Sequence, residues 1–137
     1  MAVEIYITRH GETEWSLSGQ HTGRTDLPLT YRGEEEARRL APLLSGIHFT
    51  AALCSPRHRA KMTCELVGLA SLARVEPDLA EWDYGDYEAL RTPEIHKERP
   101  GWNIFADGCP NGEAPDQVSA RADRLIQKLV ALEGNVA

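Results

Sequence analysis

The sequence has no long apolar run and no cysteine framework. Its hydrophobic residues make up 42% of the chain but form no stretch long enough for a membrane helix. The first ten residues lack the basic start, apolar core and cleavage site of a signal peptide. The three cysteines, Cys54, Cys64 and Cys109, lie far apart without CxxC spacing. We therefore expect no disulfide framework and no metal site, and the pattern favours reduced thiols in a cytoplasmic protein.

Positive charge is also scarce. Fifteen Lys and Arg residues stand against 21 Asp and Glu residues, which gives a formal net charge of -6. No basic stripe is present, so nucleic-acid and membrane partners are not expected. A few local arginines can still bind a small anionic substrate. The length of 137 residues suits one domain over residues 1–137, and it leaves open whether the protein is a homo-oligomer.

Strand and helix patterns alternate along the chain. Alternating and β-branched residues predict strands over 3–8, 49–55 and 73–77, and apolar periodicity predicts helices over 30–46, 56–69 and 114–134. The segment 79–115 looks irregular, with a short helix near 92–99. This alternation predicts an α/β fold, a three-layer α/β/α sandwich with a mostly parallel sheet.

The predicted final helix ends at Gly134, and three residues follow it. A helix in this pattern normally returns the chain to another strand, which here has barely begun. We therefore expect a C-terminally truncated sheet that lacks its last strand or strands. The expected consequence is low stability and weak activity of these 137 residues.

Two stretches place arginines where strands end. In "ITRHGETEW", Arg9 and His10 follow the first strand. Arginine donates a planar fork of hydrogen bonds to phosphate, and neutral imidazole is a nucleophile near pH 7; the alternative is a solvated polar turn. In "CSPRHRAKMT", Arg57 and Arg59 lie in the predicted first turn of a helix, where cations oppose the helix dipole unless an anion binds. For Arg57 we favour extension into water.

A third stretch, "EWDYGDYEAL", places Glu81 beside Trp82 and Tyr84. A carboxyl group near aromatic rings is partly desolvated, which favours its protonated form and suits a general acid. The other acids nearby, including Asp86 and Glu88, are interpreted as solvated. Trp15, Trp82 and Trp102 either wall a substrate cleft or pack in the core. Residues 99–113 are expected to form a mobile flap over the site.

Together with "SGQHTGRTDLPLT", these stretches resemble, in this order, the signature blocks of the histidine phosphatase superfamily, which is also called phosphoglycerate mutase-like. The resemblance covers most of the chain and is closest to the acid phosphatase and sedoheptulose-bisphosphatase-like branch. It implies no metal and no cofactor. It implies the following roles: His10 as the nucleophile that becomes phosphohistidine, Arg9 and Arg59 as the phosphoryl clamp, Glu81 as the proton donor, and Thr22, Gly23, Ser16 and Tyr84 as substrate-binding positions.

The resemblance also implies a second histidine in an "SHGH"-like stretch, which these residues do not contain. The expected function is a metal-independent phosphatase that hydrolyses small phosphate monoesters, sugar phosphates among them. One alternative is a phosphoglycerate mutase, which returns the phosphoryl group to its substrate. Another is a weakly active or inactive fragment that only binds a phosphorylated ligand.

Overall fold

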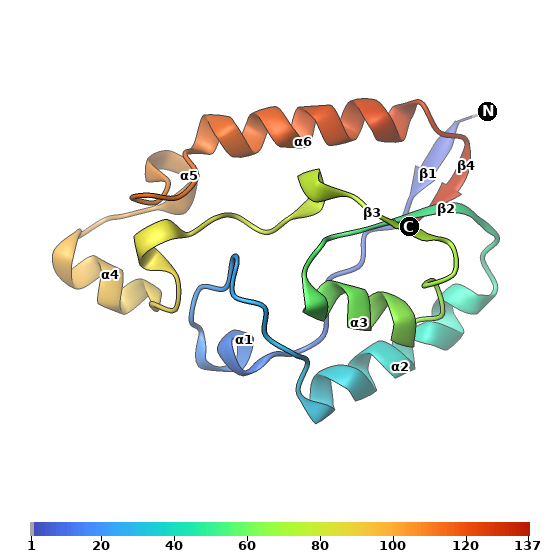
Figure 1. Ribbon diagram of the computed structural model, residues 1–137, viewed down its shortest axis with the longest axis horizontal. Helices are drawn as coiled ribbons and strands as arrows, with labels where there is room; N and C mark the ends of the chain where they lie inside the picture. The colour runs from blue at the N-terminus through green and yellow to red at the C-terminus, as the bar shows by residue number, and fades with distance from the viewer. Residues whose placement is uncertain (1) are drawn as a thin grey trace.

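Four short parallel strands form the sheet at the centre of the molecule. A computed structural model describes residues 2–137. The strands are β1 (Val3–Ile5), β2 (Phe49–Cys54), β3 (Ala73–Val75) and β4 (Gly134–Val136), and their order is β1-β4-β2-β3. The last strand of the chain therefore lies between the first two, with Val3 opposite Gly134 on one side and Phe49 opposite Asn135 on the other (Figure 1).

Helices cover both faces of this sheet. Figure 1 shows α6 on one side and both α2 and α3 on the other, so the predicted α/β sandwich is confirmed. The helices are α1 (Glu14–Ser18), α2 (Tyr31–Ser45), α3 (His58–Leu66), α4 (Thr92–Glu98), α5 (Ile104–Asp107) and α6 (Pro115–Val130), with single 3-10 turns η1 (Pro77–Leu79) and η2 (Gly85–Tyr87). Within residues 2–137, no helix combines the length and the apolar character that a bilayer crossing demands.

The predicted start and end of α2 are confirmed. The Thr30 hydroxyl accepts a hydrogen bond from the Gly33 amide at 3.0 Å, and Gly46 is the C-cap. Gly33 also lies against the loop that follows β1, because a Cβ at Gly33 would overlap the backbone of Glu12, and a Cβ at Gly11 would overlap that of Gly33. The missing side chains thus allow α2 to begin directly beside His10.

Three predicted elements have wrong boundaries. The first strand ends at Ile5 rather than at residue 8: Tyr6 still donates to the Val136 carbonyl, but β4 ends there and Ile7 is 94% exposed. The helix predicted over 56–69 spans only α3, because its N-cap is Arg57 and not Ser55, and Gly68 turns the chain with a φ of +88°.

The third wrong boundary concerns the end of the chain. The final helix stops at Val130 and not at Gly134. Gly134, with a φ of +79°, instead begins β4. The expected barely begun return strand is a paired strand in the interior of the sheet, bonded on both sides.

Two helices lie outside the predicted helical segments. Helix α1 forms in the loop after β1, because Thr13 and Ser16 cap each other: each side chain accepts a hydrogen bond from the other's amide, at 3.1 and 2.8 Å. Helix α5 forms within the predicted flap. There Asn103 is the N-cap, and its side chain accepts from the Phe105 amide.

The segment between β3 and α6 has a small core of its own. Trp82, Ile95, Trp102 and Cys109 are buried together, and the Trp102 indole donates to the Gly108 carbonyl at 2.8 Å. Both tryptophans therefore pack in the core rather than wall a cleft. The predicted flap is tied into this core on both sides of α5.

Candidate active site

A cavity of about 460 Å³ opens where the strands end. The residues after β1, the last residues of β2 and Ala137 after β4 all line it. Most of its surface is apolar and comes from the sheet, α3 and α6. Its basic and acidic lining residues are Arg9, His10, Arg57, Arg59 and Glu81. The two arginine-bearing stretches and the Glu81 stretch of the sequence thus meet in one place, at the carboxyl edge of a parallel sheet, where ligands of such folds bind.

His10 is held as a neutral ring with one free nitrogen. Its Nδ1 lies 2.7 Å from the Gly11 carbonyl oxygen. A carbonyl only accepts hydrogen bonds, so Nδ1 carries the proton and Nε2 keeps its lone pair. Burial lowers the pKa of His10, and the charges of Arg59 and Arg9 lower it further, although the bond to Gly11 and the charge of Glu81 oppose them. The ring is therefore uncharged and nucleophilic at neutral pH.

Arg59 is almost fully buried and is held by one loop. Only 1% of it is exposed. Its guanidinium donates to three backbone carbonyls, those of Thr25 at 3.0 Å and of Thr22 and Gly23 at 3.1 Å each. Burial lowers the pKa of Arg59, but an arginine with so high an ordinary pKa stays charged. Thr22 and Gly23, which were predicted as substrate-binding positions, thus contact Arg59 through their backbones. Neither is among the described residues that line the cavity.

Glu88 anchors the loop whose carbonyls bind Arg59. Its carboxylate accepts hydrogen bonds from the Gly23 amide at 2.8 and 3.1 Å and from the Thr25 amide at 3.2 Å. The interpretation of Glu88 as a solvated acid is therefore wrong. Asp86, two residues earlier, is exposed. Among the described residues, its side chain forms a hydrogen bond only with the Asn111 amide group. Nothing in the sequence separates the two carboxylates, because the partners of Glu88 lie 65 and 63 positions away.

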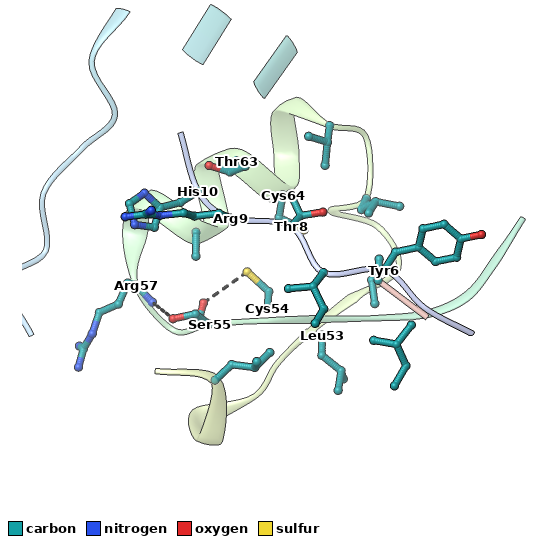
Figure 2. A pocket seen from close by; sticks show the side chains of 18 of the residues that line it. Tyr6, Thr8, Arg9, His10, Leu53, Cys54, Ser55, Arg57, Thr63 and Cys64 are labelled. Atoms are coloured by element: carbon teal, nitrogen blue, oxygen red, sulfur yellow. Dashed lines mark hydrogen bonds between the residues drawn. The ribbon is translucent and has the colours of Figure 1, made fainter. Parts of the chain in front are cut away.

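Thr63 is a second residue that the sequence analysis missed. Its hydroxyl accepts from the Gly11 amide at 3.1 Å and donates to the Arg59 carbonyl at 2.8 Å, and only 4% of Thr63 is exposed. One buried hydroxyl therefore joins the backbone beside His10 to the helix that carries Arg59. Figure 2 shows Thr63 with His10 and Arg9 on the same side of the cavity.

Glu81 lies on the cavity wall, but it is not desolvated as predicted. Its side chain is exposed and accepts a hydrogen bond from the Trp82 amide at 2.9 Å, while the Trp82 ring is buried in the neighbouring core. Arg121 of α6 fixes the segment before it. The Arg121 guanidinium donates to the Ala80 carbonyl at 2.6 Å and forms a two-point ion pair with Glu113 at 2.8 and 2.9 Å.

The other two predicted substrate positions lie apart from the main cavity. Ser16 borders a second, more polar hollow of about 370 Å³ that it shares with Arg9 and His10. The Tyr84 ring stacks on His21 with centroids 4.7 Å apart, and burial raises the pKa of its hydroxyl. The charges of Glu81 and Arg9 also act on this hydroxyl, but Tyr84 is absent from the cavity lining formed by residues 2–137.

Arg57 differs from its expected place in solvent. It is half-buried and lines the cavity, where it is the N-cap of α3. Its backbone amide donates to the Ser55 hydroxyl at 3.4 Å. Figure 2 shows its side chain extending away from Arg9 and His10.

The sequence of this chain matches a known protein family. The model of the histidine phosphatase superfamily (branch 1) matches residues 5–137. The chain belongs to the histidine phosphatase superfamily. An acid phosphatase of Mycobacterium tuberculosis is 43% identical over 124 residues, and the sedoheptulose 1,7-bisphosphatase of Saccharomyces cerevisiae is 44% identical over 147 residues. These alignments cover 89% and 90% of this chain.

The fold agrees with that membership. The solved structure of an open reading frame product of Mycobacterium tuberculosis superposes with a TM-score of 0.84 at 39% identity, covering 98% of this chain and 69% of that one. The curated relatives are longer than the part that matches: the alignments span 61% of the mycobacterial acid phosphatase and 54% of the yeast bisphosphatase.

Proposed function

We propose that this chain is the phosphohistidine-forming part of a phosphatase that hydrolyses small phosphate monoesters, sugar phosphates among them. The observation that carries the proposal is the state of His10, a neutral ring whose Nδ1 is tied to the Gly11 carbonyl beside Arg9 and Arg59. The phosphatase names of the two curated relatives support the same reaction class.

In the proposed first step, the His10 Nε2 lone pair attacks the phosphorus of the ester. The bond from phosphorus to the leaving oxygen breaks, and Glu81 gives that oxygen a proton. Arg9 and Arg59 stabilise the charge on the transferring group, because phosphoryl transfer depends mainly on positioning and charge stabilisation. In the second step, Glu81 takes a proton from water, whose oxygen attacks the phosphorus and releases phosphate and neutral His10.

Arg59 suits this role because its guanidinium is preorganised. Three carbonyls and one carboxylate-bound loop fix its position before any ligand binds. Donors that need no rearrangement stabilise a transition state more than mobile ones do. The free thiols of Cys54, Cys64 and Cys109 are consistent with the cytoplasmic setting that we propose for the protein.

The experiment is to detect the intermediate. The protein is mixed with p-nitrophenyl phosphate, quenched in alkali because phosphohistidine is labile to acid, digested and analysed by mass spectrometry. We expect a phosphate on the peptide that contains His10, with none in His10→Asn and an unchanged amount in His48→Asn, which alters an exposed histidine outside the cavity. Absence of the phosphopeptide from the unaltered protein would refute the proposal.

Product analysis separates the two alternatives. With 3-phosphoglycerate as the probe, a phosphatase releases inorganic phosphate, whereas a mutase forms the 2-phospho isomer. A protein that only binds the ligand would release nothing, and its affinity would be the same in Glu81→Gln.

A further inference from the structure

Two cysteine side chains meet in the wall of the cavity. Cys54 is the last residue of β2, and Cys64 lies in the last turn of α3. Both line the cavity, Cys54 as a buried residue and Cys64 as a half-buried one. A hydrogen bond joins the two side chains. The contact exists because α3 packs against β2, and nothing in the spacing of the two cysteines along the chain predicts it.

The surroundings of Cys54 favour its thiolate form. The pKa of Cys54 is lowered to about 7, mainly by the hydrogen bond from Cys64 and also by the charge of Lys61, against the opposing effect of burial. When protonated, the Cys54 thiol donates to the Ser55 carbonyl oxygen at 3.3 Å, a bond that Figure 2 shows. A large share of Cys54 is thus thiolate at neutral pH, and the thiolate is the form that oxidants attack.

Cys64 is suited to the role of a partner thiol. Its pKa is raised, first by the hydrogen bond that its thiol donates to Cys54, and then by burial and by the charge of Cys54. Cys64 therefore keeps its proton while Cys54 is a thiolate. Once Cys54 carries an oxygen atom as a sulfenic acid, its negative charge is gone and it no longer holds the proton on Cys64. A reactive thiolate beside a second thiol is the arrangement found in oxidant-sensitive cysteine pairs.

We propose that Cys54 and Cys64 are a modification site for peroxides, where oxidation closes a disulfide and slows phosphohistidine formation at His10. The effect on His10 rests on the proposed function, whereas the disulfide does not. Disulfides of cytoplasmic proteins are typically transient and redox-sensing, so such a bond agrees with the cytoplasmic setting proposed above.

The oxidation proceeds in two steps. The Cys54 sulfur attacks one oxygen of hydrogen peroxide, the O–O bond breaks, and the other oxygen leaves as hydroxide and takes a proton from solvent. The Cys64 sulfur then attacks the sulfur of the Cys54 sulfenic acid. The S–S bond forms as the S–O bond breaks, and the departing hydroxide takes the Cys64 proton. The pair loses two electrons, and one peroxide is reduced to two molecules of water.

Thr63, the residue before Cys64, connects the pair to the nucleophile. Its hydroxyl accepts from the Gly11 amide beside His10 at 3.1 Å and donates to the Arg59 carbonyl at 2.8 Å. A disulfide bond is about 2.05 Å long, shorter than any contact between unbonded sulfurs, so it draws the last turn of α3 towards the end of β2. Thr63 moves with that turn and displaces its partners. A displacement of about 1 Å in a site can cost ~10²-fold in rate.

Mass spectrometry after oxidation tests the proposal. The reduced protein is treated with hydrogen peroxide, its remaining thiols are blocked, and it is digested with trypsin without reduction. Cys54 and Cys64 fall in separate peptides, residues 40–57 and 62–74, so the disulfide appears as a cross-linked product of the two. The rate of phosphohistidine formation from p-nitrophenyl phosphate is measured before oxidation, after it, and again after addition of dithiothreitol.

The variants are Cys54→Ser, Cys64→Ser and Cys109→Ser, each compared with itself before and after oxidation. Cys109 is the matched control, because it lies in the small core with Trp82, where burial is the main cause that raises its pKa to about 11. We expect the cross-link in the wild type and in Cys109→Ser, with a rate that falls roughly tenfold or more and returns with dithiothreitol. Cys54→Ser forms no cross-link and keeps its rate. Cys64→Ser stops at a Cys54 sulfenic acid, which dimedone labels.

Absence of the cross-link from the oxidised wild type would overturn the proposal without reference to any variant. A cross-link that leaves the rate unchanged, or a fall in rate that persists in Cys54→Ser, would overturn it as well. Failure of the proposed function would appear separately, as absence of phosphohistidine from the fully reduced protein, in which the disulfide can still be measured.

Discussion

The Glu88 carboxylate accepts the Gly23 amide at 2.8 Å, and the carbonyl of the same Gly23 accepts the Arg59 guanidinium at 3.1 Å. One residue of the loop thus connects a carboxylate to the buried arginine of the site. Glu88 is not among the described residues that line the cavity, so we regard it as a positioning residue.

Replacing Glu88 by Gln is therefore expected to loosen Arg59. A glutamine amide would face backbone N–H groups with its own N–H, and one or two charge-assisted hydrogen bonds would be lost. We expect kcat/KM for p-nitrophenyl phosphate to fall roughly tenfold or more, mainly through kcat. The matched control is Asp86→Asn, which removes an exposed carboxylate two residues away. Equal activities of the two variants would show that the loop needs no anchor.

The acid limb of activity is expected to lie below the ordinary range of histidine. Burial, aided by Arg59 and Arg9, lowers the pKa of His10, so the ring stays neutral and nucleophilic as the pH falls through 6.5, the value of an unperturbed histidine. The rate of phosphohistidine formation, measured between about pH 4.5 and 8, should have its acid midpoint below that value. Arg9→Gln should move the midpoint upward. A wild-type midpoint at or above 6.5 would contradict the assignment of His10.

The contact between Gly33 and the His10 loop predicts a loss of stability in Gly33→Ala. The added methyl group would overlap backbone atoms of Glu12, which cannot move without displacing the loop beside His10. We expect the free energy of unfolding, from urea titration, to fall by about 1–3 kcal/mol. The control is Gly46→Ala, which has open space around it and a φ of -81°, and which should leave stability nearly unchanged. A tolerated Gly33→Ala would mean that α2 does not pack against this loop.

The ion pair between Glu113 and Arg121 contributes to the free energy of unfolding by an amount that depends on pH. Hydrogen bonding from Arg121 is the main reason why the pKa of Glu113 lies below its ordinary value. A carboxylate with a lowered pKa stabilises the fold above its unfolded pKa, about 4.3, and this contribution disappears as the pH falls through the folded pKa.

We therefore expect Glu113→Gln to be less stable than the wild type by about 1–2 kcal/mol at pH 7 in urea titrations. The difference should shrink below pH 4, once the wild-type carboxyl is protonated. Glu98→Gln, an exposed α4 residue, serves as control and should differ at neither pH. A difference between wild type and Glu113→Gln that persisted at low pH would indicate packing rather than charge.

Local signals in the sequence were enough for the first three strands, the large helices and the residues at the strand ends, although some boundaries were wrong. Thr30 and Gly46 mark α2 because caps act on neighbouring atoms. Glu88 and Thr63 could not be found in this way, since their importance comes from partners 65 and 52 positions away. The place of β4 was missed for a similar reason: its three residues form a strand only because β1 and β2 leave a gap of one strand between them.

That gap has a consequence for how the protein is made. β1 and β2 are synthesised before β4, yet they pair with each other only through it. Until then, a nascent chain holds two strands whose facing edges are open, and such edges invite pairing with other chains. Burial of Val136, none of which is exposed, thus joins β1 to β2, and this part of the sheet forms only after β4 has been synthesised.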